Sequence, residues 1–218
     1  MINFLFNNYL NNKNQMTLDY SKIIEETEEW VKDKMKDYDC SHNFDHVLRV
    51  KKMAIKIAFK EDLKDFDIFK IVMGALTHDV ADSKYSSIPN EQETSIKEFL
   101  KDKISDNSII DEIVYIACNT SLSKEVANIH NIDKNNINLK CVQDADRIDS
   151  LGSIGICRYF MYGIHKNKSK INDIITNINN RSKIVLKFIK TKYGRKIAKR
   201  KYKIIHKFIK NYKKDLKI

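Results

Sequence analysis

The sequence predicts one all-α domain, built as a bundle of helices. Its 218 residues include only five glycines and one proline, so the turns that β-hairpins need lack their usual residues. Apolar residues recur at spacings of three and four along most of the chain, which is the period of amphipathic helices. A chain of this length buries a large core without disulfides or other cross-links. We therefore expect long helices that pack around one core.

The N-terminal boundary of the domain is expected near Thr17. Residues 1–16 begin with a short apolar stretch that asparagines interrupt, and they lack the basic start and long apolar run of a signal peptide. We expect a loose N-terminal extension over 1–16 and a single helical domain over 17–218. The first helix follows Thr17, a suitable N-cap residue, and its apolar face passes Trp30 and reaches Met35.

The next two helices are expected at the centre of the bundle. One opens after His42 and continues to Ala58, with His46 on its core-facing side. The other runs from Phe66 to Asp79 and has Asp65 as its expected cap. It is apolar nearly all round, which is typical of a central helix.

The rest of the chain predicts further helices, with one long polar segment between them. Asn90 and Glu93 have the spacing of a capping box, and Asp106 suits the N-cap of the helix that follows. The segment 119–138 is polar and aperiodic, and it is long enough to be an active-site loop. The expected helices run from 90 to about 103, from 106 to 116 and from 139 to 151, followed by two lysine-rich amphipathic helices around 184–189 and 197–212.

The charge and the cysteines indicate the class of partner and the compartment. The formal net charge is +11, which suits a partner that carries phosphates. Lysine-rich codon usage explains the same charge, so a dedicated nucleic-acid surface is the less favoured explanation. No apolar run reaches the roughly 18 residues of a membrane span. The four cysteines stand far apart without a C-x-x-C pair, as expected of reduced thiols in a cytoplasmic protein.

The third expected helix ends in a histidine and an aspartate side by side. His78 and Asp79 follow the apolar run 71–76, and an ionised carboxylate is rarely buried without a partner. A core histidine that is hydrogen-bonded to a neighbouring aspartate explains the pair. A metal ion bound by both side chains explains it as well.

Three aspartates lie within an apolar pattern later in the chain. Asp146 and Asp149 are one helical turn apart, whereas Asp144 points elsewhere. A solvated acidic face is the usual explanation of such residues. It fits poorly here, because the chain is basic and apolar residues lie between the acids.

The candidate metal ligands are two imidazoles and two carboxylates from three helices. They suit one divalent ion, whether Mn, Mg, Co, Ni, Fe or Zn, and leave positions open for water and substrate. Residues far apart in sequence converge where the central helices of a bundle pack together, so we expect the site between those helices. The set is His46, His78, Asp79 and either Asp144 or Asp146.

Several stretches resemble the HD-domain superfamily of metal-dependent phosphohydrolases, in its small single-domain bacterial branch. They are 41–50 (SHNFDHVLRV), 77–84 (THDVADSK) and 142–152 (VQDADRIDSLG). A further stretch, GICRYF at 155–160, is similar to the same branch. The similarity runs from about Thr17 to the end of the sequence.

The resemblance decides between the two acids. In the family, the last metal ligand is followed by a basic or small polar segment and then, one turn on, by another acid. Arg147 and Asp149 follow Asp146 in this way. The ligands that the resemblance implies are His46, His78, Asp79 and Asp146.

The implied activity is hydrolysis of nucleotides or related phosphate esters and anhydrides. A bound metal lowers the pKa of its water from about 16 toward about 7, which makes a metal-bound hydroxide available as the nucleophile. Cations then neutralise the charge on the phosphoryl oxygens. We expect catalytic roles for Asp82 and His42, although a helix cap and an ordinary loop histidine explain them equally. The expected substrate-binding cations are Arg49, Lys84, Arg147 and Arg158.

Two other classes of function fit parts of the pattern. A helical module without catalysis would use the basic surface to hold a nucleotide or a nucleic acid. The intact ligand set argues against it, because a binder has no use for convergent histidines and aspartates. A di-iron site for oxygen chemistry would need more ligands than this set provides. We therefore expect an enzyme whose partner is a small phosphate substrate rather than a membrane.

Overall fold

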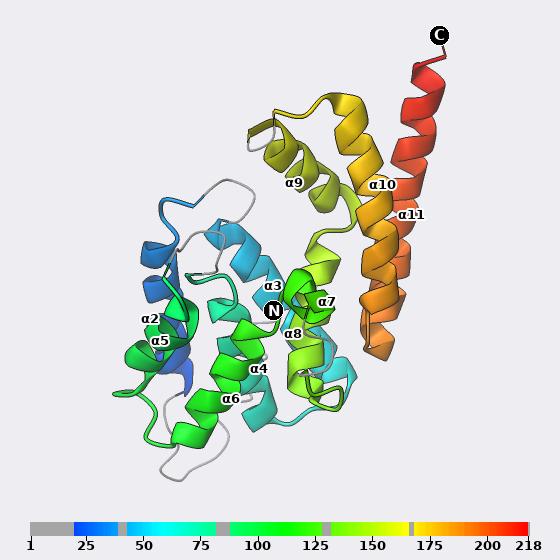
Figure 1. Cartoon of the computed structure of the whole chain (residues 1–218). Helices are drawn as coiled ribbons and strands as arrows, with labels where there is room; N and C mark the ends of the chain where they lie inside the picture. Colours follow the sequence, from blue (N-terminus) through cyan, green and yellow to red (C-terminus); the bar gives the residue numbers. More distant parts are fainter. Residues whose placement is uncertain (1–19, 39–42, 82–87, 128–131, 166–167, 218) are drawn as a thin grey trace.

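The computed structural model describes residues 20–38, 43–81, 88–127, 132–165 and 168–217. Within these residues the chain is all-α, with ten helices and no strand (Figure 1), which confirms the predicted fold class. The helices are α2 (Tyr20–Lys34), α3 (Phe44–Lys60), α4 (Asp65–Thr77), α5 (Glu91–Leu100), α6 (Asn107–Cys118), α7 (Leu122–Ala127), α8 (Ile137–Asp149), α9 (Gly152–His165), α10 (Ile171–Phe188) and α11 (Lys192–Asp215).

The core lies where α3, α4 and α8 pack against one another. All residues of α4 from Ile68 to Thr77 are buried, as its apolar pattern predicts. This helix contacts α2, α3, α6 and α8. Because α4 is enclosed on all sides, the side chains at its C-terminal end are held in place by the core.

Gly74 allows α4 and α6 to approach each other closely. A Cβ at this position would overlap the side chain of Ile116 on α6. Ile116 is fully buried, and its branched Cβ restricts it to few rotamers, so it has no space into which to move. The close contact therefore offsets the cost of a glycine inside a helix.

Helices α9, α10 and α11 form a second part of the bundle beside α8 (Figure 1). The two lysine-rich segments correspond to α10 and α11, which pack against each other. Thr191 caps α11, because its Oγ1 accepts a hydrogen bond from the N–H of Gly194 at 3.0 Å. Oδ2 of Asp144 in turn accepts a hydrogen bond from the N–H of Thr191 at 2.7 Å. This contact joins the middle of α8 to the start of α11.

The central helix α4 ends two residues earlier than predicted. It ends at Thr77, and His78 follows as its C-cap instead of lying inside the helix with Asp79. Nδ1 of His78 donates a hydrogen bond to the carbonyl oxygen of Ala75 at 2.8 Å. The side chain thus takes an acceptor that the end of the helix leaves open.

One predicted cap is wrong, a second lies at the predicted position without a side-chain hydrogen bond, and a short helix lies within the predicted loop. The N-cap of α4 is Lys64, whereas Asp65 is the first helical residue, where a negative charge favours the helix dipole. Asn90 is the N-cap of α5, as predicted, but its φ is 59° and its side chain makes no capping hydrogen bond. The predicted cap at Asp106 is confirmed. Helix α7 occupies part of 119–138, the segment that lacks helical periodicity.

The predicted N-terminal extension, residues 1–16, lies outside the described residues, as does Thr17. Across the described ranges, the helices are too short or too polar to cross a membrane. Cys118, Cys141 and Cys157 are free thiols, as the wide spacing of the cysteines predicts.

Candidate metal centre

His46 and His78 face each other at the centre of the bundle. His46 lies in the first turn of α3, where Asn43 caps the helix and accepts a hydrogen bond from the N–H of His46 at 3.2 Å. His78 directly follows α4. Both rings are buried, and their Nε2 atoms lie 3.3 Å apart. The start of one central helix and the end of another therefore bring the two predicted imidazoles together.

Both rings are held with Nδ1 as the hydrogen-bond donor. Nδ1 of His46 lies 2.8 Å from Oδ2 of Asp149, and Nδ1 of His78 lies 2.8 Å from the carbonyl oxygen of Ala75. A carboxylate and a carbonyl only accept, so each Nδ1 donates. In the neutral rings each Nε2 then carries a lone pair, and the two lone pairs face each other. A cation between the rings satisfies both, which is how metal-binding histidines are usually oriented.

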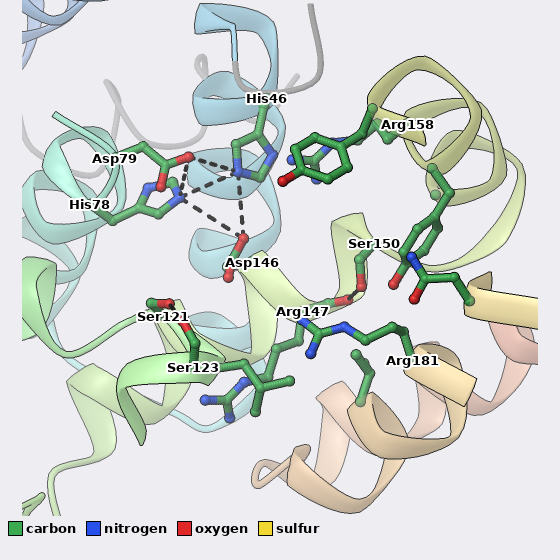
Figure 2. A pocket seen from close by; sticks show the side chains of 16 residues that line it. His46, His78, Asp79, Ser121, Ser123, Asp146, Arg147, Ser150, Arg158 and Arg181 are labelled. Atoms are coloured by element: carbon green, nitrogen blue, oxygen red, sulfur yellow. Dashed lines mark hydrogen bonds and ion pairs between the residues drawn. The ribbon is translucent and has the colours of Figure 1, made fainter. Parts of the chain in front are cut away.

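Two carboxylates complete the donor set (Figure 2). Oδ2 of Asp79 lies 3.4 Å from Nε2 of His46 and 3.5 Å from Nε2 of His78. Oδ1 of Asp146 lies 3.4 Å and 3.9 Å from the same two nitrogens. Donors that share one ion at about 2.0–2.2 Å are spaced by roughly 3–4 Å. His46, His78 and Asp79 therefore fit a single divalent ion, because one ligand atom from each lies within 4.8 Å of the others.

The carboxylates give the site a strong preference for positive charge. Burial lowers the pKa of His46, but hydrogen bonds to Asp146, Asp149 and Asp79 outweigh burial and raise this pKa to about 10. Burial raises the pKa of Asp146, whereas its hydrogen bond with His46 and the nearby His78 bring this pKa below its usual value. A divalent ion would satisfy the same carboxylates and would displace the proton from Nε2 of His46.

Asp144 and Asp146 point to different parts of the molecule. Oδ2 of Asp144 accepts hydrogen bonds from the N–H and the Oγ1–H of Thr191, both at 2.7 Å, and Oδ1 accepts one from the N–H of Lys190 at 2.9 Å. Burial raises the pKa of Asp144, and the bonds from Thr191 and Lys190 oppose that rise. This carboxylate therefore joins helices, whereas the carboxylate of Asp146 lies beside the imidazoles. The geometry supports Asp146 as the fourth ligand, and its role stays a prediction.

Asp149 supports the predicted ligand set, a role that was not predicted from the sequence. Its Oδ1 accepts from Nε of Arg49 at 2.8 Å, and its Oδ2 accepts from Nη2 of Arg49 and from Nη1 of Arg158, both at 2.9 Å. Burial raises the pKa of Asp149, but the bonds from His46 and Arg49 lower it far below its usual range. The available sequence signal for Asp149 is its position one helical turn after a predicted ligand, and this spacing does not by itself indicate what the carboxylate contacts.

The predicted substrate-binding arginines already have protein partners. Arg49 and Arg158 share Asp149, and Arg158 also lines the cavity described below. The side chain of Arg147 is 1% exposed, pairs with Glu125 and donates to the carbonyl oxygen of Phe188 at 2.8 Å. Their roles toward a substrate stay predictions. Three other predicted residues lie outside the described residues, namely His42, Asp82 and Lys84.

A cavity of about 340 Å³ opens beside the donor set. The four donors, the end of α8 and residues 121–123 at the start of α7 form one wall, and α9 and α10 form the other. This volume lies within the range of pockets that hold small organic ligands. Arg158 on α9 was predicted from the sequence, but the other side chains of the second wall were assigned no role, because their spacing matches the outer faces of ordinary amphipathic helices. They include Tyr159, Tyr162, Asn177 and Arg181.

Comparison with known proteins agrees with this geometry. A model of the HD domain family matches residues 43–151. The chain belongs to the HD domain family. The matched stretch contains every described donor of the candidate metal centre, and it also contains Asp149. The resemblance stated from the sequence motifs is therefore confirmed.

Proteins similar to this HD chain cover nearly its whole length. The uncharacterized protein YpgQ of Bacillus subtilis is 26% identical over 209 residues, which are 89% of this chain and 94% of YpgQ. The crystal structure of Lin1889 from Listeria innocua has a TM-score of 0.71 and 26% identity, and the match covers 92% of this chain and 98% of that one. An HD-superfamily hydrolase from Bacillus thuringiensis has a TM-score of 0.70 and 26% identity, with 91% and 98% covered. The structure of YpgQ in complex with ADP has a TM-score of 0.71 and 22% identity, with 88% and 97% covered.

Proposed function

We propose that this HD-domain protein is a metal-dependent phosphohydrolase that cleaves nucleotides or related phosphate esters and anhydrides. The observation that carries the proposal is the meeting of two Nε2 acceptors and two carboxylates on the wall of a ligand-sized cavity. A purely structural cluster has no need of two imidazoles whose acceptor atoms face each other. The similar hydrolase from Bacillus thuringiensis supports the same class of reaction.

The positions of the ligands indicate where a phosphoryl group would lie. His46, His78, Asp79 and Asp146 would hold one divalent ion, and the 25% exposed side chain of Asp146 leaves the cavity side open. When bound, the ion supplies a water that is acidic enough to attack at neutral pH, and it polarises a phosphoryl oxygen. Arg158, on the cavity wall, adds positive charge beside the transferred group.

The proposal keeps proton-transfer roles for Asp82 and His42. In the sequence, Asp82 lies three residues after Asp79, and His42 lies four residues before His46. Either residue suits the task of orienting water or moving a proton. Lys84 is proposed as a further contact to phosphate, because it lies close to Asp79 in the sequence.

A nucleotide is the substrate class that we propose. The cavity of about 340 Å³ has room for much more than a phosphoryl group, and the net charge of +11 favours an anionic ligand. YpgQ, which is 26% identical to this chain, has been crystallised with ADP. The free thiols suit a reducing compartment such as the cytoplasm.

The test is a panel of nucleotides assayed with one added metal at a time, with phosphate and pyrophosphate release measured separately. We expect turnover that disappears in His78→Ala and persists in His206→Ala, the matched control, because His206 is exposed on α11. Turnover that needs neither metal nor His78 contradicts the proposal. If no nucleotide of the panel is hydrolysed but nucleotides still bind, a module that binds without catalysis is favoured.

A further inference from the structure

Arg181 is a cation of the cavity wall that pairs with no carboxylate in the described part of the chain. Its side chain is exposed, and Figure 2 shows it extending from α10 toward the end of α8. The other arginines near the site, Arg49, Arg158 and Arg147, each pair with an aspartate or a glutamate. Arg181 is therefore available to an anion that enters the cavity.

The neighbours of Arg181 form a polar and aromatic wall. Asn177 lies one helical turn before it on α10 and lines the same cavity, so the two side chains share a face of the helix. Tyr159 and Tyr162 of α9 line the cavity beside them. Burial raises the pKa of the Tyr159 phenol, and the charge of Arg181 opposes that rise, which places the two groups close together. The wall thus combines a guanidinium, an amide and phenols, all of which donate hydrogen bonds to oxyanions.

This wall and the metal centre are separate parts of one cavity. The donors of the metal centre come from α3, α8 and the end of α4, whereas Arg181 comes from α10. One phosphoryl group at the donors would leave most of the roughly 340 Å³ for the rest of the ligand. A second positive group on the far wall suits a second negative group on the same ligand. The planar fork of an arginine matches two oxygens of one phosphate.

We propose that Arg181, with Asn177 beside it, binds a phosphate of the substrate other than the one that is attacked. The site would then select nucleoside diphosphates and triphosphates over monophosphates. The inference rests on the proposed function for its account of substrate choice. Its binding part does not require turnover, so the two are tested separately.

The test measures the binding of ADP and AMP by calorimetry to the protein with its divalent metal and to three variants. We expect Arg181→Ala to weaken the binding of ADP about 10- to 100-fold, the usual range for the loss of a hydrogen bond to a charged group. The affinity for AMP should be nearly unchanged. Arg181→Lys keeps the charge without the planar fork, so it should recover part of the loss. Lys183→Ala is the matched control, because Lys183 is exposed on the same helix outside the cavity. Metal content and melting temperature show whether each variant is folded and loaded.

The outcomes test the binding role of Arg181 separately from the proposed hydrolysis. Equal weakening of ADP and AMP overturns the inference, because Arg181 would then contact the phosphate at the metal centre. Unchanged ADP binding in Arg181→Ala, or failure of the unaltered protein to bind ADP, overturns it as well. If ADP binding depends on Arg181 but no nucleotide is hydrolysed, the binding site stands and the proposed hydrolysis fails.

Discussion

Asp149 accepts a hydrogen bond from Nδ1 of His46 across 2.8 Å, although 103 positions separate the two residues in the sequence. This contact fixes both the ring orientation and the tautomer, because Nδ1 must donate and Nε2 must then face the other donors. The same carboxylate holds Arg49 and Arg158. We therefore expect the affinity of the candidate centre for metal to depend on a residue outside the predicted ligand set.

Replacing Asp149 tests this dependence. Asp149→Asn should weaken metal binding about 10- to 100-fold, because a neutral amide orients the imidazole less firmly and leaves the two arginines without their counter-charge. Competition with a chromophoric chelator measures the affinity. Asp33→Asn, which removes an exposed carboxylate of α2, should leave it unchanged. An Asp149→Asn protein that binds metal as tightly as the unaltered protein would contradict the supporting role.

Metal binding should release a proton. The pKa of His46 is raised to about 10, so Nε2 carries a proton at neutral pH in the metal-free protein, and the ion must displace it. The observed affinity should therefore rise with pH, by up to about tenfold per unit below that pKa. Calorimetry in two buffers of different ionisation enthalpy at pH 7 measures the number of protons released. A binding enthalpy that is the same in both buffers would show that no proton is displaced.

The buried pair of Arg147 and Glu125 predicts a large effect on stability. Glu125→Gln leaves the guanidinium of Arg147, which is 1% exposed, without its carboxylate. Removing one partner of a buried pair costs about 3–5 kcal/mol, and Lys190 loses the same partner. Urea denaturation measures the free energy of unfolding. Glu98→Gln removes an exposed carboxylate that pairs with Lys101, and it should change that free energy by less than about 1 kcal/mol.

The same variant should change how stability depends on pH. Burial raises the pKa of Glu125, but Lys190 and Arg147 outweigh burial and bring this pKa below its usual value. The ionised carboxylate therefore stabilises the fold above its unfolded pKa of about 4.3. That stabilisation is lost as the pH falls through the lower folded pKa. The unfolding free energy of Glu125→Gln should accordingly fall less steeply below pH 5 than that of the unaltered protein. If the unfolding free energies of the two proteins fall with the same slope below pH 5, the prediction is wrong.

Gly74→Ala should destabilise the protein by about 1–2 kcal/mol, although alanine normally stabilises a helix relative to glycine. The added Cβ overlaps the side chain of Ile116, and overpacking of this kind costs about 1–3 kcal/mol. Ile116→Ala removes the obstacle and provides the control. In that background Gly74→Ala should be neutral or stabilising, as measured by thermal unfolding. An increase in stability from Gly74→Ala alone would show that the two helices can separate at little cost.

The central part of the site was predictable because helical periodicity reveals which side of a helix is buried. The spacing around His46 places this residue on the core face, and the apolar run before His78 marks the central helix. These two positions therefore had to lie inside the bundle, and the structure brings their Nε2 atoms to 3.3 Å. The length of α4 was less predictable, because the bond from His78 to the carbonyl of Ala75 depends on a single side chain.

Asp149 and Arg181 show what periodicity does not reveal. An aspartate one turn after a ligand has the same spacing whether it bonds an imidazole or faces water, and the distance from α8 to α3 decides between the two. Arg181 lies among the many cations of the last third of the chain. Its place in the cavity wall follows from how α9 and α10 pack beside the end of α8. The local sequence does not indicate either of these two packing arrangements.

The donors of the metal centre come from the start of α3, the residues after α4 and the last turns of α8. A nascent chain that ends before α8 lacks Asp146, the predicted fourth ligand, and Asp149, the partner of His46. Tight uptake of the ion should therefore follow the docking of α8 onto α3 and α4, a long-range step of folding. A coloured ion such as Co²⁺ would thus report, during refolding, the moment at which the centre of this bundle closes.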